Sequence, residues 1–231
     1  MVITEAIILA GGLGTRLKDS VPDVPKCLAP VNGKPFLSYV LDHLIDEGIN
    51  HFIFALGYKS ELVIDFICKE YPTILHKISA EEEPLGTGGA IRLACSHAKE
   101  KSVLVTNGDT LFKIDVDELA SFNTLSGANC TLSLKYLENF DRYGVVEIDD
   151  DCAITSFKEK AFYSSGLVNG GMYALNVHKF LEEELPEKFS FEKDYLETLF
   201  DKRRMFGIEQ DCYFIDIGIP EDYERAQKEL K

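Results

Sequence analysis

Apolar and polar positions alternate with two different periods along the first half of the chain. Short apolar runs rich in β-branched and aromatic residues are separated by longer amphipathic stretches. The short runs predict strands at residues 4–10, 51–56, 74–79 and 102–106. The amphipathic stretches predict helices at Pro35–Glu47, Lys59–Tyr71, Gly88–Ala98 and Asp115–Leu125. This order is typical of parallel βαβ units and indicates an α/β protein with a Rossmann-like, doubly wound sheet.

The pattern changes after Leu125, where strand-like runs follow one another directly. These runs predict strands at Asn129–Leu137, Tyr143–Ile148, Ala153–Lys158 and Val168–Leu175. The rest of the chain predicts helices at 177–185 and 190–204, a strand at 212–216 and a last helix from Pro220. Hairpin-like neighbours after a βαβ half predict a mixed, mostly parallel sheet whose second half covers the binding crevice.

Composition and charge narrow the class of protein. The chain has 231 residues, of which 45% are apolar, and this is enough for a sizeable core. No Gly/Ser/Pro-rich linker or internal repeat divides it, so we expect one domain over residues 1–231. The formal charge of −15 argues against nucleic acid or an anionic membrane as a partner, because either demands a basic face.

The cysteines and the N-terminal residues indicate in which cellular compartment the protein is expected. Cysteines stand at positions 27, 68, 95, 130, 152 and 212, without a C-x-x-C pair or a zinc-ligand spacing, and we interpret them as reduced thiols. The N-terminal apolar run has no basic n-region and is too short for a signal peptide or a membrane span. We therefore expect a cytoplasmic protein. The sequence leaves the oligomeric state, including a homo-oligomer, open.

A glycine-rich turn follows the first predicted strand. The apolar run Glu5–Leu9 leads into Ala10-Gly11-Gly12-Leu13-Gly14-Thr15, and Arg16 and Lys26 follow closely. Backbone N–H groups in such a turn can bind an anion, and two cations downstream can clamp what the turn holds. The sequence therefore predicts a triphosphate site at this turn.

The glycine-rich turn agrees less well with two other nucleotide-binding motifs, the dinucleotide fingerprint and the Walker A loop. The stretch Gly12–Leu17 lacks the third glycine of a dinucleotide fingerprint, and the strand at 51–56 is followed by Gly57-Tyr58-Lys59 rather than by an acidic partner for a ribose. A Walker A loop needs Gly-Lys-Ser/Thr, which this stretch does not contain. A plain glycine turn between a strand and a helix stays open, but it does not explain Arg16 and Lys26.

The stretch Leu9–Leu17 followed by Pro25-Lys26 resembles the signature of the sugar-1-phosphate nucleotidyltransferases, and later segments match in order. Among the subfamilies, the compact length, Val21–Lys26 and Asn32–Phe36 most resemble the heptose-1-phosphate guanylyltransferases. The resemblance implies a fold of the nucleotidyltransferase or glycosyltransferase-A type. It also implies a cytoplasmic enzyme that makes a nucleotide sugar from a nucleoside triphosphate, with GTP favoured, and a sugar 1-phosphate, with a heptose as first choice. Mannose, glucose or N-acetylmuramic acid 1-phosphate with GTP, dTTP, CTP or UTP stays open as an alternative.

The expected chemistry explains the catalytic residue types. A sugar-phosphate oxygen attacks the α-phosphorus of the triphosphate and pyrophosphate leaves, so the protein must hold two polyanions and neutralise charge. The resemblance assigns Arg16 to the leaving pyrophosphate, which suits its planar fork of donors, and Lys26 to the reacting phosphates. The family's usual Pro-Lys-Pro is here Pro25-Lys26-Cys27, and we interpret Cys27 as a packing residue.

Two distant aspartates are the predicted metal ligands. Asp109 follows the strand at 102–106, and Asp216 ends the strand at 212–216. Taken alone, an aspartate after a strand is more often a turn residue or a helix cap. In the family, the two matching positions hold Mg²⁺, and this ion prefers few carboxylates together with phosphate oxygens. The resemblance therefore implies a Mg²⁺-dependent reaction.

Each of the remaining candidate residues is expected to bind one of the two substrates. Residues 1–126 are expected to bind mainly the nucleotide, and residues 127–231 mainly the sugar. Glu83–Gly88 resembles the family's base-recognition segment, whose glycines permit close approach of a base, although a flexible loop with a capping Thr87 stays open. The expected nucleotide residues are Leu9, Ala10, Gly11, Gly12, Gly14, Thr15, Glu83, Pro84, Gly86, Thr87, Gly88, Asn107 and Gly108. The expected sugar-phosphate residues are Tyr143, Gly144, Glu159, Lys160, Asn169 and Gly170.

Three consecutive aspartates, Asp149-Asp150-Asp151, lie between two predicted strands. They indicate a solvated hairpin turn rather than a metal site.

The alternative from another class is a non-catalytic protein that binds nucleotide sugars. Such a protein could keep the glycine turn while losing its charged residues. Because Arg16, Lys26, Asp109 and Asp216 are all present, the sequence favours the enzyme.

Overall fold

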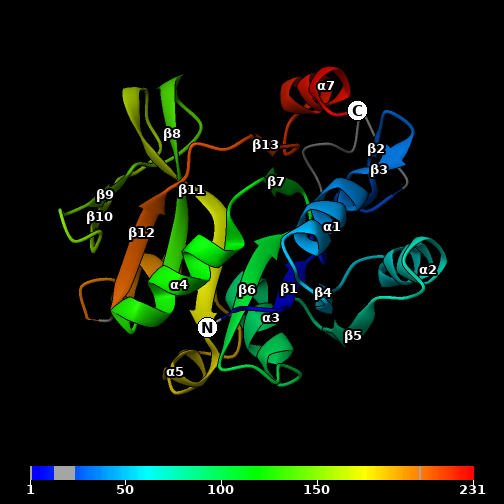
Figure 1. Cartoon of the computed structure of the whole chain (residues 1–231), viewed down its shortest axis with the longest axis horizontal. Coiled ribbons are helices and arrows are strands. Elements are labelled where there is room, and N and C mark those ends of the chain that lie inside the picture. The colour runs from blue at the N-terminus through cyan, green and yellow to red at the C-terminus, as the bar shows by residue number, and fades with distance from the viewer. Residues whose placement is uncertain (1, 13–23, 203) are drawn as a thin grey trace.

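Strands from both halves of the chain pair into one mixed sheet (Figure 1). The computed structural model describes residues 2–12, 24–202 and 204–231, so Gly14, Thr15 and Arg16 lie outside the described residues. Within the described residues the sheet has seven strands, which in spatial order are β12 (Met205–Glu209), β8 (Cys130–Phe140), β11 (Tyr163–Asn176), β6 (Ser102–Asn107), β1 (Glu5–Leu9), β4 (His51–Leu56) and β5 (Leu75–Ala80).

The direction of the strands agrees with the predicted fold class. β1 pairs in parallel with β4 and β6, β4 pairs in parallel with β5, and β12 pairs in parallel with β8. β11 is antiparallel to both of its neighbours, β6 and β8. The sheet is therefore mixed and mostly parallel, as the sequence predicts.

Helices cover both faces of this sheet. One face packs against α1 (Phe36–Asp46), α2 (Ser60–Glu70), α4 (Val116–Ser126) and α7 (Pro220–Glu229), and the other against α3 (Gly86–Cys95) and α5 (Val177–Leu181). In β1, Ala6 and Ile8 join the first core and Ile7 the second. Because such strands are buried on both faces, they are continuous apolar runs in the sequence.

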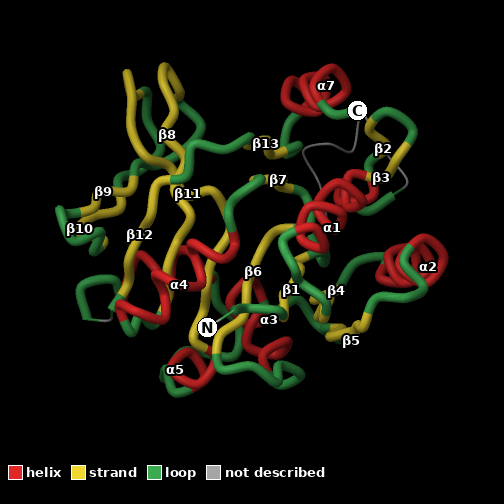
Figure 2. The backbone as a smooth tube through the Cα atoms, in the orientation of Figure 1, coloured by secondary structure: helices red, strands yellow, loops and turns green. Residues whose placement is uncertain are grey.

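Short strand pairs lie outside the main sheet (Figure 2). They are β2 (Pro30–Val31) with β3 (Lys34–Pro35), β9 (Val146–Ile148) with β10 (Ile154–Phe157), and β7 (Thr110–Phe112) with β13 (Phe214–Asp216). The last pair matters most for function, because it joins the segment that follows β6 to a segment near the C-terminus.

The helix predicted at 190–204 is shorter and less regular than expected. The structure has a π-helix, η2 (Phe191–Leu196), a single turn, α6 (Glu197–Leu199), and then the strand β12, which the sequence analysis does not predict. Phe191, Tyr195 and Leu196 are buried at spacings that resemble a longer amphipathic helix. β12 is only five residues long and contains Gly207, so its strand signal is weak.

Other boundaries also differ from the prediction. The strand expected from Tyr143 begins at Val146, and the helix expected to reach residue 185 ends at Leu181. Helix α3 begins at Gly86 and ends at Cys95, earlier than predicted at both ends. In contrast, β8 and β11 are longer than predicted, because their outer parts pair with each other in an antiparallel ribbon that extends beyond the other strands.

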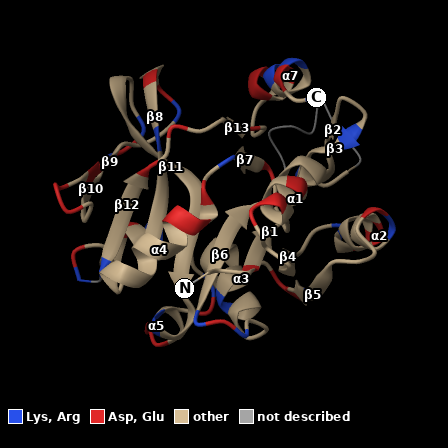
Figure 3. Ribbon diagram, in the orientation of Figure 1, with Lys and Arg blue, Asp and Glu red and all other residues tan. Residues whose placement is uncertain are grey.

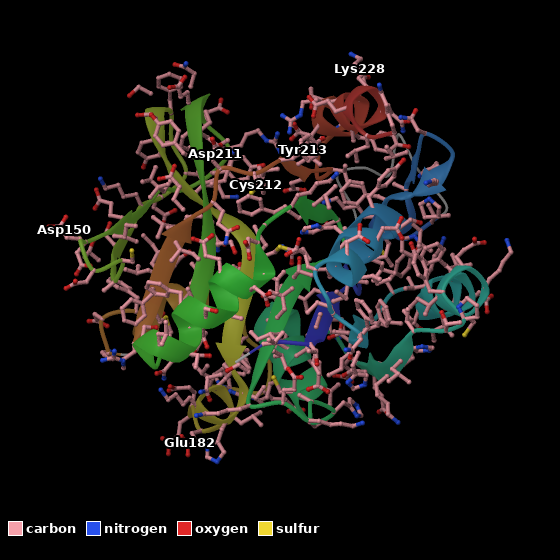
Figure 4. All side chains as sticks on the ribbon, viewed as in Figure 1. Asp150, Glu182, Asp211, Cys212, Tyr213 and Lys228 are labelled. Atoms are coloured by element: carbon pink, nitrogen blue, oxygen red, sulfur yellow. The ribbon has the colours of Figure 1, made fainter. Side chains whose placement is uncertain are left out.

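Acidic side chains are spread over several elements, including α2, α4, α7 and the β9–β10 hairpin (Figure 3). At the tip of that hairpin, Asp149 Oδ1 accepts hydrogen bonds from the N–H groups of Asp151 (3.0 Å) and Ala153 (2.8 Å). Asp150 points outward there (Figure 4), which confirms the predicted hairpin turn. In the part of the chain that the structure describes, no helix is long and apolar enough to cross a membrane.

Candidate active site

The carboxyl ends of β1, β4, β5 and β6 surround a cavity of about 620 Å³. This is the edge at which open α/β sheets bind ligands. Among the described residues, its lining is Leu9, Gly11, Gly12, Ala55, Gly57, Tyr58, Glu81, Glu82, Glu83, Pro84, Gly86, Thr87, Ala90, Asn107 and Asp109. Four strand ends therefore contribute to one binding space.

Backbone hydrogen bonds between strand ends fix the shape of this edge. The Ala10 N–H donates to the Ala55 carbonyl at 3.0 Å, and the Gly108 N–H donates to the Leu9 carbonyl at 2.9 Å. On the far side, the Glu81 N–H donates to the Leu56 carbonyl at 3.0 Å. Because these bonds continue the sheet pattern past the strands, the lining is held by main chain as well as by side chains.

Most of the expected nucleotide residues within the described part line this cavity, namely Leu9, Gly11, Gly12, Glu83, Pro84, Gly86, Thr87 and Asn107. Ala10, Gly88 and Gly108 lie beside it and are buried. A Cβ on Gly108 would lie 3.2 Å from both Cys27 Cβ and the Leu9 carbonyl oxygen. The absence of a side chain at Gly108 is therefore explained by packing between the glycine turn and the Lys26 segment.

Thr87 does not cap α3. The residue before that helix is Leu85, which makes no side-chain capping bond. Thr87 Oγ1 instead donates to Glu192 Oε2 at 2.8 Å and accepts from the N–H of Phe191 at 2.9 Å. Its hydroxyl therefore links the cavity to the segment around η2.

The sequence analysis assigns no role to Gly57 and Tyr58, although both line the cavity. Gly57 follows β4 as Gly11 follows β1, and a Cβ on Gly11 would lie 2.9 Å from the Gly57 nitrogen. The two glycines therefore allow neighbouring strand ends to approach each other closely. The signal that could have identified Gly57 is its position at the carboxyl end of a parallel strand next to β1.

Lys26 lies between the two aspartates predicted as metal ligands. Lys26 Nζ is 2.5 Å from Asp109 Oδ2 and 3.4 Å from Asp216 Oδ1. The three side chains are 16%, 30% and 28% exposed, respectively. Asp216 Oδ1 also accepts a hydrogen bond from the N–H of Gly218 at 2.7 Å. The structure thus brings together three residues that are far apart in the sequence.

The short strands explain how these residues meet. β7 and β13 are antiparallel, with Asp216 opposite Thr110, the residue after Asp109. The Ile217 N–H donates to the Asp109 carbonyl at 3.1 Å and extends this pairing. Lys26 opens the short 3-10 helix η1 (Lys26–Leu28), in which Cys27 is buried as the predicted packing residue.

The charges of this group influence one another. Burial, followed by the neighbouring Asp109 carboxylate, raises the pKa of Asp216, and the attraction of Lys26 only partly opposes this. Burial alone would lower the pKa of Lys26, but the carboxylates of Asp109 and Asp216 raise it above its usual value. Lys26 is therefore a stable cation held between two acidic side chains.

The expected sugar residues Asn169 and Gly170 lie near the nucleotide side. β11 is irregular between Asn169 and Tyr173 in its pairing with β8. Asn169 Oδ1 accepts from the Gly171 N–H at 2.9 Å, and its Nδ2 donates to Tyr173 Oη at 3.0 Å. A Cβ on Gly171 would lie 2.9 Å from Asn107 Nδ2. The irregular part of β11 therefore lies directly beside the end of β6.

The other expected sugar residues come from two loops. A Cβ on Gly144 would lie 2.2 Å from the Lys158 carbonyl oxygen, so the two loops are in backbone contact there. Glu159 and Lys160 follow in the loop between β10 and β11, and both are exposed. Tyr143 lies closer to the aspartates: burial, and then the Asp216 carboxylate, raises its pKa to about 12.

Comparison with known proteins shows to which family the chain belongs. The family model described as nucleotidyl transferase matches residues 5–231. The chain belongs to the nucleotidyl transferase family. This membership confirms the family resemblance of the glycine turn and the segments that follow it.

Two relatives of the chain carry the name D-glycero-alpha-D-manno-heptose 1-phosphate guanylyltransferase. The one from Aneurinibacillus thermoaerophilus is 46% identical, and the match covers 98% of both chains. The one from Campylobacter jejuni is 45% identical, over 95% of this chain and 96% of the relative. The chain is therefore similar to heptose 1-phosphate guanylyltransferases over nearly its whole length, which confirms the predicted resemblance.

Solved structures agree with this placement. A crystal structure of HddC from Yersinia pseudotuberculosis complexed with GMP-PN is 36% identical, with a TM-score of 0.88 over 99% of this chain and 100% of that one. A putative glucose-1-phosphate thymidylyltransferase from Bacillus anthracis is 22% identical with a TM-score of 0.81, and shares the fold. The nucleotidyltransferase fold class predicted from the sequence is confirmed.

Proposed function

We propose that this nucleotidyl transferase family member joins GMP from GTP to D-glycero-α-D-manno-heptose 1-phosphate, forming GDP-heptose and pyrophosphate in the cytoplasm. The observation that carries the proposal is the placement of Lys26, Asp109 and Asp216 in one group, with Asp109 in the wall of a cavity at the carboxyl edge of the sheet. The names of relatives at 46% and 45% identity supply the choice of base and sugar.

The reaction needs positioning more than proton transfer. A phosphate oxygen of the heptose 1-phosphate attacks the α-phosphorus of GTP, and a new P–O bond forms there. The bond from the α-phosphorus to the bridging oxygen of the β-phosphate breaks, and pyrophosphate leaves with the electron pair. Because the nucleophile is already an anion, the protein has no proton to remove, and its task is to bring two polyanions together.

Lys26 is the proposed cation for the reacting phosphates. Its ammonium stays charged at neutral pH, because the flanking carboxylates raise its pKa. When phosphates enter the site, their oxygens offer alternative partners to this ammonium. Arg16 is the proposed partner of the leaving pyrophosphate, on the basis of the motif that contains it.

Asp109 and Asp216 are the proposed ligands of Mg²⁺. Two carboxylates that converge on one cation are a fitting donor set for a hard ion that also takes phosphate oxygens. Among the described residues, no cluster of three or more His, Cys, Asp and Glu side chains could form a closed metal cage, and a site completed by substrate does not require one. When bound, the ion would offset negative charge on the phosphates.

The two halves of the chain have different proposed tasks. All described residues that line the cavity lie within residues 1–126, and this half would bind GTP, with a carboxylate among Glu81–Glu83 accepting from a guanine N–H. Residues 127–231 would bind the sugar phosphate through the residues around Gly144, Glu159, Lys160 and Asn169. Asn107 lies where the two halves meet, since it lines the cavity and lies close to Gly171.

A substrate panel tests this proposal. The purified protein with Mg²⁺ is given each of GTP, ATP, CTP, UTP and dTTP with heptose, mannose, glucose or N-acetylmuramic acid 1-phosphate, and pyrophosphate release is measured. GTP with the heptose 1-phosphate should give the highest kcat/KM. Release with another pair alone would change the assigned substrates. Nucleotide-sugar binding without any release would favour the non-catalytic alternative.

A further inference from the structure

The segment around Phe189, in the second half of the chain, holds the start of α3 in place. The Gly88 N–H donates to the Phe189 carbonyl at 3.0 Å, and the Phe189 N–H donates to the Leu85 carbonyl at 3.0 Å. A Cβ on Gly86 would lie 2.5 Å from the Phe189 carbonyl oxygen, and a Cβ on Gly88 would lie 2.1 Å from the Phe189 ring. The glycines therefore let this segment press closely against the loop that lines the cavity.

Arg92, further along α3, fastens the same segment. Its guanidinium donates to the carbonyls of Leu185 and Pro186, at 3.0 Å each, and lies 4.6 Å from the centre of the Phe189 ring. The two hydrogen bonds are made to main-chain carbonyls, so they fix the path of the segment as well as the position of the Phe189 ring. The segment reaches η2 already fixed against α3.

Glu192 completes this attachment beside the cavity. Its Oε2 accepts from Thr87 Oγ1 at 2.8 Å and from Ser190 Oγ at 3.0 Å, and Thr87 Oγ1 accepts from the N–H of Phe191 at 2.9 Å. Thr87 lines the cavity, whereas Glu192 is not among the described residues that do. One acceptor oxygen of Glu192 therefore joins Thr87, at the start of α3, to Ser190 in the segment before η2.

We propose that Glu192 is a positioning residue for nucleotide binding, which acts by holding Thr87, and with it the segment Pro84–Thr87 at the start of α3, in the conformation that binds the nucleotide. The proposal rests on the proposed function, since it concerns the same cavity. It gives part of the half expected to bind the sugar a task in binding the triphosphate. The task needs the acceptor oxygen of Glu192 and the hydroxyl of Thr87, but not the negative charge itself.

The test measures the Kd of an α,β-methylene analogue of GTP by calorimetry, because this analogue does not undergo transfer. Thr87→Val and Glu192→Ala should each weaken binding by roughly three- to tenfold, as expected for the loss of one hydrogen bond. The double variant should bind about as weakly as either single variant, because the two changes break the same interaction. In turnover assays, KM for GTP should rise more than kcat falls.

Conservative variants separate this role from general damage to the fold. Thr87→Ser keeps the hydroxyl and Glu192→Gln keeps an acceptor oxygen, so both should bind the analogue within about twofold of the wild type. Thr124→Val changes an exposed threonine of α4, on the opposite face of the sheet, and is the matched control. Thermal unfolding of each variant reports its folding, and the comparison is made among variants that unfold like the wild type.

Two results would overturn the inference. One is wild-type affinity in both Thr87→Val and Glu192→Ala, and the other is losses that add fully in the double variant. A failure of the proposed function is distinguishable, because the wild type would then bind the α,β-methylene analogue of another nucleoside triphosphate and not that of GTP. The same variants would be compared with that analogue, and the expected pattern of losses is unchanged.

Discussion

Lys26 Nζ lies 2.5 Å from Asp109 Oδ2, so the proposed phosphate ligand pairs with a proposed metal ligand. An ammonium held in this position competes with a divalent ion for the same oxygen. If Asp109 and Asp216 bind an ion as proposed, Lys26 would have to leave Asp109 Oδ2, and its ammonium would then be available to phosphates. The proposed metal site would thus couple metal binding to the release of Lys26.

Lys26→Met should strengthen Mn²⁺ binding in the absence of nucleotide, by about tenfold, because it removes both a competitor and a repulsive charge. Turnover of the same variant should fall by orders of magnitude, since the cation for the phosphates is lost. Electron paramagnetic resonance of free Mn²⁺ measures the affinity without relying on activity. Unchanged or weaker Mn²⁺ binding would show that Lys26 does not compete with the ion.

Asp109→Asn and Asp216→Asn should each raise the Mg²⁺ concentration needed for half-maximal turnover by about tenfold or more, because an amide is a weaker ligand than a carboxylate. The matched control is Asp211→Asn. Asp211 lies in the segment between β12 and β13 (Figure 4), is 93% exposed, and pairs with Lys135. Mg²⁺ titrations of the two site variants that match the Asp211→Asn curve would exclude these ligands.

Gly218→Ala should weaken metal binding with little loss of stability. The added Cβ would lie 2.9 Å from Asp216 Oδ1 and 3.2 Å from Lys26 Nζ. Both atoms belong to side-chain ends that can shift, so we expect a stability cost below about 1 kcal/mol. Because the Asp216 carboxylate would be displaced, the variant should bind Mn²⁺ several times more weakly than the wild type. Thermal unfolding and Mn²⁺ affinity measure the two effects, and an unchanged affinity would contradict the assigned position of Asp216.

The buried pair of Glu5 and His51, at the opposite end of the sheet, should make stability depend on pH. Burial alone would raise the pKa of Glu5, but the N–H groups of Glu100 and Lys99, together with His51, lower it below its usual value. A carboxyl group with a lowered pKa stabilises the folded state above its unfolded pKa. This stabilisation begins to be lost as the pH falls through the unfolded pKa and is gone once the pH is below the folded pKa.

Glu5→Gln should therefore lower the free energy of unfolding at pH 7 by about 1–3 kcal/mol and flatten its dependence on pH between about 5 and 3. Urea unfolding at several pH values measures both effects. Glu184→Gln, which changes an exposed glutamate, provides the comparison. If the Glu5→Gln profile ran parallel to that of Glu184→Gln, the account of this buried pair would be wrong.

The first half of the fold was predictable because its strands are buried on both faces. Ile7 packs on one side of β1 while Ala6 and Ile8 pack on the other, and this produces the unbroken apolar run. β12 was not predictable in this way. It lies at the edge of the sheet, has five residues, and takes its place through parallel pairing with β8, which only the tertiary structure supplies.

The positions of candidate site residues could be predicted where a motif residue ends or follows a strand. Contacts between distant segments could be predicted less well. Asp109 and Asp216 could be placed at one edge because each follows or ends a strand, but the pairing of β7 with β13 that joins them left no clear sequence signal. The hydrogen bond between Thr87 and Glu192 joins segments 105 residues apart. Such a contact depends on the path of the segment at Phe189, which the hydrophobic pattern does not encode.

One competition assay tests the proposed base and sugar together. The protein is incubated with Mg²⁺, D-glycero-α-D-manno-heptose 1-phosphate and equal concentrations of GTP, ATP, CTP, UTP and dTTP, and the nucleotide sugars formed are identified by mass spectrometry. We expect GDP-heptose as the main product, formed together with an equal amount of pyrophosphate. A mixture that contains no nucleotide-heptose, or one in which another base predominates, would show that the proposed function is wrong.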